Sequence, residues 1–318
     1  MTPAQLRTYA AVVRNGASKP AAAELGVSEA AVSNHISALR KELDDRLFQR
    51  SRDGLVFTPG GLRLASRAVE MLGLQEQTKA EVHAAAAGQR LLRLAVSSLF
   101  GEYCAPGLIE LFATRARDLR VEMAVHPPTS FADLLERRGA DLALGPSMAG
   151  VSRTTPSIEF VRYQQVVVAA RNHPAASVSL TKAAAASVDW LLGPSAIDVG
   201  GVANRTLVEL EVPEARQLVY QSSEAALAAA RAGDGVAFGL LHKVADEIKT
   251  GRLVALPMAS GPMHGTWTIY SGEAHQLTPA AKELLRFVQT PRAVQAVLSG
   301  SAARISHFKP SVHVTLWS

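Results

Sequence analysis

The sequence predicts an α/β protein in three parts: a small helical head, one long helix and a larger two-lobed α/β remainder. Two observations lead to this prediction. Apolar residues recur with helical spacing through roughly the first ninety residues, whereas short apolar strands alternate with helices from Leu91 onward. With 318 residues, 48% of them hydrophobic and 19% charged, the chain is long enough for two or three domains with sizeable cores.

Three helices are expected in the head. The first is amphipathic and ends near Asn15-Gly16, and the second spans Lys19 to Leu25, where Pro20 fits only in the first turn. Gly26-Val27 forms a tight turn, and Ser28 caps a third helix that runs to Leu39. Leu47 and Phe48 then close a small core.

The third helix has two different faces. Its apolar residues repeat with the period of a helix, so this stripe is expected to pack inside: Val32, Ile36, Leu39 and Leu43. The opposite face carries only small or polar residues: Ser28, Glu29, Ser33, Asn34 and Ser37. A helix buried on one side and lined with short hydrogen-bonding groups on the other suits the DNA major groove.

Two further elements follow the three helices. Ser51 to Phe57 predicts a hairpin wing that turns at Asp53-Gly54. Thr58-Pro59 starts a helix that continues to about Ala87, which is longer than a typical globular helix. Its two apolar stripes fit packing on its own domain or pairing with a second copy, and the length favours the dimer.

From Leu91 onward the expected strands are nearly all apolar, which favours a parallel sheet covered on both faces. The expected strands are 91–96, 121–125, 141–144, 165–170, 190–192, 217–220 and 236–240, with 267–270 extended. The expected helices are 106–117, 131–138, 202–210, 225–232 and 279–288. This pattern repeats as two similar halves, and the chain crosses between them near 161–164 and again near 266–269.

With these residues in place, the chain resembles the LysR-type transcriptional regulators. The likeness is close over residues 4 to 65 and weaker to about residue 290. It includes Leu25-Gly26-Val27-Ser28, Leu47-Phe48, Arg50, Thr58-Pro59-Gly60 and Asp141-Leu142-Ala143-Leu144. The chain departs from the family's usual glutamine at Glu29, basic residue at Asn34, glycine at Asp44 and phenylalanine at Ser18.

The resemblance implies a winged helix-turn-helix, a linker helix and a two-lobed α/β effector domain of the periplasmic-binding-protein type. The expected domains are a DNA-binding domain at 1–58, a linker or dimerisation helix at 59–88, and an effector-binding domain at 89–290. Within that domain, lobe I is expected at 89–161 and 268–290 and lobe II at 162–267, and residues 291–318 form a C-terminal tail.

DNA-binding residues are expected on the third helix, on the wing and on the second helix. They are Ser28, Glu29, Ala30, Ser33, Asn34, Ser37, Arg50, Arg52 and Lys19, with Arg40 a weaker phosphate candidate. Asn34 can pair with adenine through two hydrogen bonds. Glu29 either accepts from cytosine or stabilises the helix N-terminus. Arg50 and Arg52 either contact backbone phosphate or a minor groove, or are ordinary solvated charges.

Hydroxyl groups follow three predicted strands where each meets a helix, at Ser97-Ser98, Thr129-Ser130 and Ser195-Ala196. Each alone is a good helix cap. Together they favour a small-molecule site between the lobes, a place that family members use for effectors. A small organic acid is the expected ligand.

Other classes of site find little support. Cys104 is the single cysteine, so neither a disulfide nor a cysteine-based zinc site is expected, and a buried, inert thiol is favoured. The nine histidines are scattered, and Gly233-Asp234-Gly235 lacks the ending of a phosphate loop. No metal, cofactor or enzyme activity is therefore expected. The alternative is a small-molecule-binding α/β protein or enzyme with an incidental helical appendage.

The bulk composition is consistent with a regulator in the cytoplasm. The chain has a net charge of +5, but residues 1–60 carry eight Lys or Arg against six Asp or Glu, so placement matters more than excess. No export signal and no apolar run of about 20 residues is seen. The expected partners are double-stranded DNA, a small-molecule effector and a second copy or three more copies, with no membrane. Alternation at Val312, Val314 and Leu316 predicts a strand in the tail.

Overall fold

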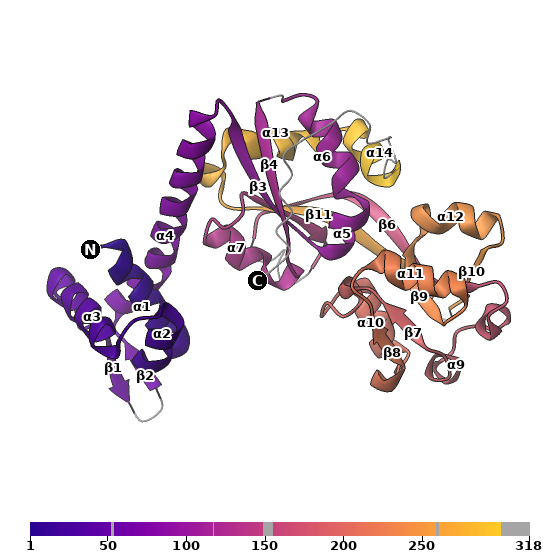
Figure 1. The fold of residues 1–318 in the computed structure, drawn as a ribbon, viewed down its shortest axis with the longest axis horizontal. Helices are drawn as coiled ribbons and strands as arrows, with labels where there is room; N and C mark the ends of the chain where they lie inside the picture. The colour runs from indigo at the N-terminus through magenta and orange to yellow at the C-terminus, as the bar shows by residue number, and fades with distance from the viewer. Residues whose placement is uncertain (52–53, 117, 149–154, 259–260, 300–318) are drawn as a thin grey trace. The chain divides into compact units, whose positions relative to one another are not determined.

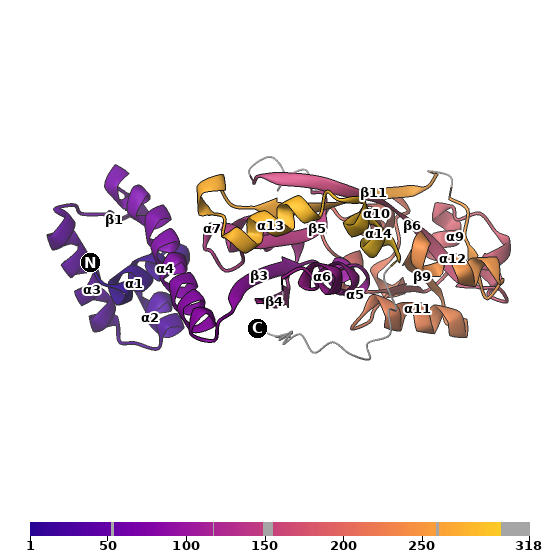
Figure 2. The ribbon, with the colours of Figure 1, turned by 90° about the horizontal axis from the view of Figure 1, so that it is seen from above.

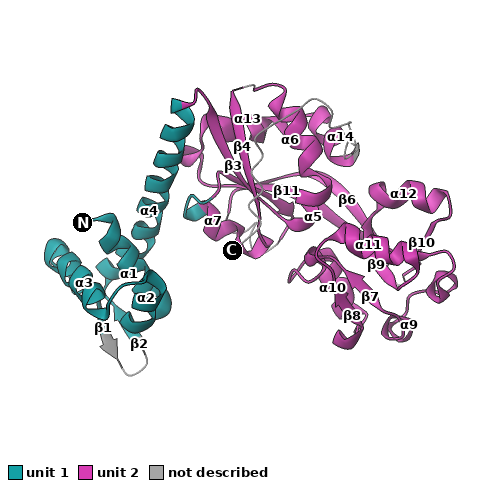
Figure 3. Ribbon diagram, in the orientation of Figure 1, with its two compact units in different colours: residues 1–86, 136–139 teal, residues 87–135, 140–318 magenta. Residues whose placement is uncertain are grey.

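The structure is a computed structural model that describes residues 1–51, 54–116, 118–148, 155–258 and 261–299. It divides into two compact units (Figures 1 and 3). Unit 1 comprises residues 1–86 with 136–139, and unit 2 comprises 87–135 with 140–318. Residues 300–318 lie outside the described residues, and so does the strand predicted for the tail.

Unit 1 contains the head and the long helix. Its elements are α1 (Pro3–Asn15), α2 (Ser18–Leu25), α3 (Glu29–Leu43), β1 (Phe48–Ser51), β2 (Gly54–Phe57) and α4 (Pro59–Ala86). The strands β1 and β2 pair antiparallel from Phe48 opposite Phe57 to Ser51 opposite Gly54. These elements match the predicted three helices, hairpin and long helix.

Short polar side chains cap the N-terminal ends of α3 and α4. The Ser28 hydroxyl accepts a hydrogen bond from the Ala31 N–H at 3.2 Å, and the Thr58 hydroxyl accepts one from the Gly61 N–H at 2.9 Å. Each satisfies an N–H group that the helix itself leaves unpaired. The turn after α2 uses Gly26 at φ 63°, the left-handed conformation that glycine adopts without a steric penalty. The predicted caps at Ser28 and Thr58 are therefore confirmed.

The core of the head is apolar, and the hydroxyl group of Tyr9 is buried in it. Tyr9, Val32, Leu39 and Leu47 are all 0–1% exposed. The Tyr9 hydroxyl donates to the Gly61 carbonyl at 2.9 Å and so ties α1 to the start of α4. Burial raises the pKa of Tyr9 to about 12, so it stays a hydrogen-bond donor at neutral pH.

Unit 2 is the α/β part. Its strands are β3 (Arg90–Val96), β4 (Leu119–Val125), β5 (Leu142–Pro146), β6 (Ser157–Ala170), β7 (Trp190–Leu192), β8 (Gln217–Val219), β9 (Val236–Leu240), β10 (Leu253–Ala255) and β11 (Met263–Ser271). Its helices are α5 (Ser98–Tyr103), α6 (Ala105–Ala113), α7 (Phe131–Glu136), α9 (Lys182–Ala186), α10 (Val202–Glu209), α11 (Ser223–Ala232), α12 (Leu241–Lys249), α13 (Pro279–Phe287) and α14 (Pro291–Ser299).

The strands form two parallel groups joined by two long strands. In lobe I, β3 pairs parallel with β4 and β5; in lobe II, β7 pairs parallel with β8 and β9. The long strands β6 and β11 pair antiparallel with each other and pass from one group to the other (Figures 1 and 2). The predicted parallel sheets are thus present within each lobe. The crossing strands add antiparallel pairs, because the chain returns to lobe I in the opposite direction.

Each lobe has its own apolar core. Lobe I buries Phe100, Trp267 and Leu284, which come from α5, β11 and α13. Lobe II buries Trp190 and Leu207 on one face of its sheet and Leu227 and Val244 on the other. The predicted fold class, an α/β chain with a winged helix-turn-helix, a linker helix and two lobes, is confirmed. No helix in the described part of the chain is both long and apolar enough to span a membrane.

The structure differs from the sequence prediction in several elements. Helices α5, α9 and α12 were not expected, and β6 begins at Ser157, well before the expected strand at Gln165. Helix α14 occupies the first part of the predicted tail, and its Ala293 and Val297 are 0% exposed in the core of lobe I. The folded part therefore extends past residue 290, because these two side chains are part of that core.

Candidate nucleic-acid interface and ligand cleft

Helix α3 presents two faces of opposite character. Val32 and Leu39 are 0% exposed and Ile36 is 5% exposed, so this stripe anchors the helix in the head. The residues predicted to read DNA are all exposed: Ser28, Glu29, Ala30, Ser33, Asn34 and Ser37. This face has the small polar groups and the accessibility that a helix needs to enter a major groove.

A groove open to solvent lies beside this face of α3. Ser33 and Ser37 line it together with Arg40 and Arg46. The Arg40 guanidinium donates to the Arg46 and Phe48 carbonyls at 2.8 and 2.7 Å and lies 4.9 Å from the centre of the Phe48 ring. Arg40 therefore holds the turn after α3, which makes it a poor phosphate candidate.

Arg46 is a site residue that the sequence analysis missed. It is exposed and lines the same groove as Ser33 and Ser37. It stands between Asp45 and Leu47, in an irregular turn where no periodic pattern marks a functional position. A cation next to the exposed face of α3 suits a contact with backbone phosphate.

The remaining predicted DNA contacts lie at the edges of this face. Ser28 is the N-cap of α3, and Glu29 follows in the first turn, where negative charge is favourable. Lys19 is exposed on α2. Arg50 lies in β1, but its side chain is outside the described residues, and Arg52 lies outside them altogether.

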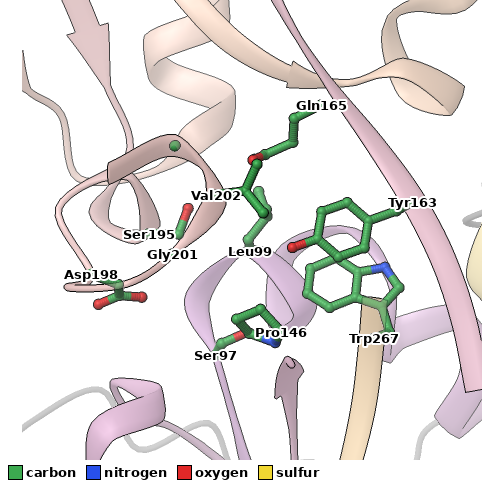
Figure 4. A pocket seen from close by; sticks show the side chains of 11 residues that line it. Ser97, Leu99, Pro146, Tyr163, Gln165, Ser195, Asp198, Gly201, Val202 and Trp267 are labelled. Carbon is green, nitrogen blue, oxygen red and sulfur yellow. The ribbon is translucent and has the colours of Figure 1, made fainter. Parts of the chain in front are cut away.

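Unit 2 has a narrow cleft between its two lobes, with a cavity volume of about 20 Å³ (Figure 4). Ser97 follows β3, Tyr163 and Gln165 lie on the crossing strand β6, and Trp267 lies on β11. Ser195 and Asp198 come from the segment between β7 and α10 in lobe II. Both lobes and both crossing strands therefore contribute to one pocket.

Two aromatic rings form one wall of the cleft. Tyr163 and Trp267 stack with their ring centres 4.1 Å apart and their planes inclined by 25°. The Tyr163 hydroxyl points across the pocket toward the segment of Ser195 and Asp198 (Figure 4). Gly265 makes room for this ring, because a Cβ there would lie 2.3 Å from Tyr163 Cζ. Burial raises the pKa of Tyr163, which keeps its hydroxyl protonated.

The cleft contains polar groups that lack protein partners. Ser97 is 1% exposed, and its Oγ has no hydrogen-bond partner in the described chain; the same holds for Nε1 of Trp267. Asp198 is half-buried, and burial raises the pKa of its carboxyl to about 6. Buried groups of this kind are costly unless something satisfies them. A ligand is one way of doing so.

The six residues predicted to bind an effector lie in different places. Ser97 and Ser195 line the cleft. Thr129 is exposed, and the Ser130 hydroxyl donates to the Pro127 carbonyl at 2.8 Å. Ser98 is half-buried at the start of α5, and Ala196 is 3% exposed in the core of lobe II. None of these last four lines the cleft.

Cleft residues that the sequence analysis missed include Tyr163, Gln165, Asp198 and Trp267. Tyr163 and Trp267 stand in the two segments where the sequence places the crossings between the lobes. A strand that crosses between two lobes passes the space between them. The position of these crossings was therefore the available clue to the cleft.

The potential metal ligands of the described residues are dispersed. They contain no group of three or more His, Cys, Asp or Glu residues that could hold a metal ion. Cys104 is 0% exposed, and burial raises the pKa of its thiol to about 12, which leaves it unreactive.

Comparison with known families decides between these possibilities. A family model described as "Bacterial regulatory helix-turn-helix protein, lysR family" matches residues 3–62. A second, "LysR substrate binding domain", matches residues 85–291. The chain belongs to the LysR family of transcriptional regulators. It is therefore a DNA-binding regulator with an effector-binding domain, and not an enzyme.

Individual LysR-family relatives support this assignment. The uncharacterized HTH-type transcriptional regulator Rv0377 of Mycobacterium tuberculosis is 48% identical, with 100% of both chains covered. The RuBisCO operon transcriptional regulator of Allochromatium vinosum is 28% identical, with 89% of this chain and 94% of that protein covered.

Solved structures share the fold. The probable transcriptional regulator PA0477 from Pseudomonas aeruginosa has a TM-score of 0.54 at 20% identity, covering 91% of this chain and 96% of that one. Full-length LysG from Corynebacterium glutamicum, with bound effector Arg, has a TM-score of 0.51 at 20% identity, covering 93% and 98%.

Proposed function

We propose that this LysR-family regulator reads a specific DNA sequence through the exposed face of α3. The observation that carries the proposal is that face itself: Ser33, Asn34 and Ser37 are exposed, while Val32, Ile36 and Leu39 hold the helix from behind. Asn34 is the residue best suited to read a base, since its amide can make two hydrogen bonds to adenine. Arg46, Lys19, Arg50 and Arg52 are the proposed phosphate or minor-groove contacts, and they position the helix without reading sequence.

The protein works as a homodimer or homotetramer in this proposal. The long helix α4 supports it, because several of its large apolar residues are exposed: Leu62, Met71, Leu74 and Val82. An unpaired helix with such residues is favoured to pack against a second copy. Two heads would then contact half-sites about 34 Å apart, or a multiple of that spacing.

A small molecule in the cleft regulates this DNA binding in the cytoplasm. Ser97 and Ser195, two of the residues expected from the sequence, line a pocket that both lobes build. A solved relative of the same fold, LysG, is described with a bound effector, and another, DarR of Vibrio fischeri, in complex with DNA. A ligand that binds one arrangement of the lobes better than another shifts the population toward that arrangement. On the sequence alone the expected ligand is a small organic acid.

The test is a gel-shift of the purified full-length protein on DNA from upstream of its own gene. Binding is expected to be tighter than to a scrambled fragment of equal length and to weaken as salt rises. Binding that is equal on both fragments would contradict a specific regulator. No binding to DNA, together with saturable small-molecule binding, would favour the alternative of a ligand-binding protein with a helical appendage.

A further inference from the structure

The charge of the cleft is unusual for a site expected to hold an organic acid. The lining residues include serines, a glutamine, a tyrosine and a tryptophan. Asp198 is the one lining residue whose side chain carries a charge at neutral pH. No Lys, Arg or His is among them. A carboxylate ligand would therefore meet a like charge in the lining, whereas the cation that acts on the cleft, Arg205, lies outside the lining, where its charge opposes the rise in the pKa of Tyr163.

Asp198 itself needs a partner. Burial is the cause of its raised pKa of about 6, with no contribution from a neighbouring cation. At neutral pH most of the carboxyl is still ionised, so a half-buried negative charge faces the pocket. Burying a charge without an opposite charge or hydrogen bonds is unfavourable. A ligand that supplies them removes this free-energy cost, which strengthens its binding.

The charged and polar groups around Asp198 do not neutralise it. Arg205, the nearest cation on α10, donates from its guanidinium to the Gly200 carbonyl at 2.8 Å. The Gly201 N–H, at the start of α10, donates to the Asp198 backbone carbonyl at 2.9 Å, which leaves the side chain out of this bond. Tyr163 stays a neutral phenol, because burial raises its pKa.

The opposite wall of the cleft also favours a cation. Tyr163 and Trp267 stack on each other there, so the pocket meets the hydroxyl edge of Tyr163, whose oxygen can accept a hydrogen bond from an ammonium group. The Tyr163 hydroxyl points toward the side of the pocket that carries Asp198 (Figure 4). The cavity itself is about 20 Å³, room for about one water molecule, so the two walls must move apart to admit a ligand, which then contacts both of them.

We propose that the effector is a small molecule with a positively charged amino group, held by the Asp198 carboxylate and the Tyr163–Trp267 wall. Ser97 Oγ, which has no partner in the described chain, hydrogen-bonds another polar group of the same ligand. This inference rests on the proposed role of the cleft as the effector site, and it replaces the organic acid expected from the sequence.

The experiment uses two matched pairs of probes on the full-length protein: benzylamine against benzoate, and putrescine against succinate. Melting temperature and calorimetric titration are measured for the natural protein, for Asp198→Asn and for Asp246→Asn. Asp246 is an exposed carboxylate on α12 and serves as the control. We expect an amine to raise the melting temperature, and Asp198→Asn to weaken its binding about tenfold or more. Asp246→Asn is expected to bind as the natural protein does.

Three results would overturn the inference: stabilisation by a carboxylate and not by its matched amine, amine binding unchanged in Asp198→Asn, or no response to either amine at millimolar concentration. The gel-shift of the same samples separates these results from failure of the proposed function. A protein that binds its upstream DNA specifically but ignores amines would remain a regulator with a different ligand.

Discussion

The exposed face of α3 and the cleft of unit 2 handle polar groups in opposite ways. On α3, Ser33, Asn34 and Ser37 stand in solvent, where water satisfies them until another surface arrives. In the cleft, Ser97 and Trp267 are buried, and their side-chain atoms Oγ and Nε1 have no hydrogen-bond partner within the described residues. Water can satisfy the polar groups on α3 without a partner, whereas the buried polar atoms of the cleft still lack hydrogen bonds.

This difference indicates how each site gains specificity. A surface helix loses little in the absence of DNA, and it discriminates through a few added hydrogen bonds at base edges. A cleft with unpaired buried groups discriminates more strongly, because a ligand that leaves them unpaired also leaves their desolvation penalty in place. Variants of each region should therefore affect one binding activity and spare the other.

The largest expected effect is on the anchoring of α3. Leu39→Ala removes a side chain that is 0% exposed in the core of the head and should lower the free energy of unfolding by about 2–5 kcal/mol. DNA binding should be lost at the same time. Urea unfolding and gel-shifts measure both effects. Ser37→Ala, on the exposed face of the same helix, should change stability by less than about 0.5 kcal/mol. Equal stability of the two variants would contradict the packing described here.

The next effect is on the aromatic wall of the cleft. Gly265→Ala places a Cβ 2.4 Å from the Tyr163 hydroxyl oxygen, so the ring must move. We expect a loss of about 1–3 kcal/mol in the free energy of unfolding and weaker amine binding, with DNA binding retained. Combining Gly265→Ala with Tyr163→Ala should cost less than the sum of the single variants, because the clash disappears. Strict additivity would mean that Gly265 does not position Tyr163.

The effect of Asn34→Ala should depend on the DNA sequence. Losing its two hydrogen bonds should reduce binding free energy by about 1–3 kcal/mol at one base position and make that position tolerant of substitution. Gel-shifts against a set of single-base operator variants measure this loss. Asn172→Ala, an exposed asparagine of unit 2, is the matched control. An equal loss on every DNA sequence would show that Asn34 reads no base.

A smaller effect tests Asp198 through pH. Its pKa rises from 3.8 to about 6 on folding, so the folded state binds the extra proton between those values. Stability from this group therefore falls as pH rises through that window. At about pH 7.5, Asp198→Asn should raise the free energy of unfolding by on the order of 1 kcal/mol, and the gain should shrink toward pH 4. Urea unfolding across this range measures it, and a pH-independent difference would contradict the assignment.

The smallest effect concerns a departure from the family pattern. Asp44 ends α3 at φ 48°, in the left-handed region where the family usually has glycine. Asp44→Gly should raise the free energy of unfolding by about 0.5 kcal/mol. Asp45→Gly should do the opposite, since Asp45 accepts hydrogen bonds from Thr58 Oγ1 at 2.7 Å and the Leu47 N–H at 2.6 Å. Thermal unfolding measures both changes in stability. An increase in stability for both variants would contradict the different roles of Asp44 and Asp45.

Local sequence predicted the head better than the cleft for a physical reason. The signals that predict the head lie within short stretches of chain: the helical period of Val32, Ile36 and Leu39, and the caps at Ser28 and Thr58. The cleft brings together Ser97, Tyr163, Asp198 and Trp267, which lie far apart in sequence. Strand-end hydroxyls indicated Ser97 and Ser195, but Asp198 follows an irregular segment, where no periodicity marks which side chains face inward. Helix α14 was not predicted, because Ala293 and Val297 give too short an apolar pattern to mark a helix.

The crossing strands limit how the two lobes can move. Because β6 is one unbroken strand from Ser157 to Ala170, the lobes are not separate bodies on a loose tether. A change in the angle between them has to bend this ribbon and its partner β11. The register of that ribbon shifts between Trp267 and Thr268, where a regular ladder is already interrupted. The ribbon therefore bends most easily beside the indole of Trp267, which forms part of the pocket wall. A ligand in the pocket and a bend in the ribbon would thus both displace the Trp267 side chain.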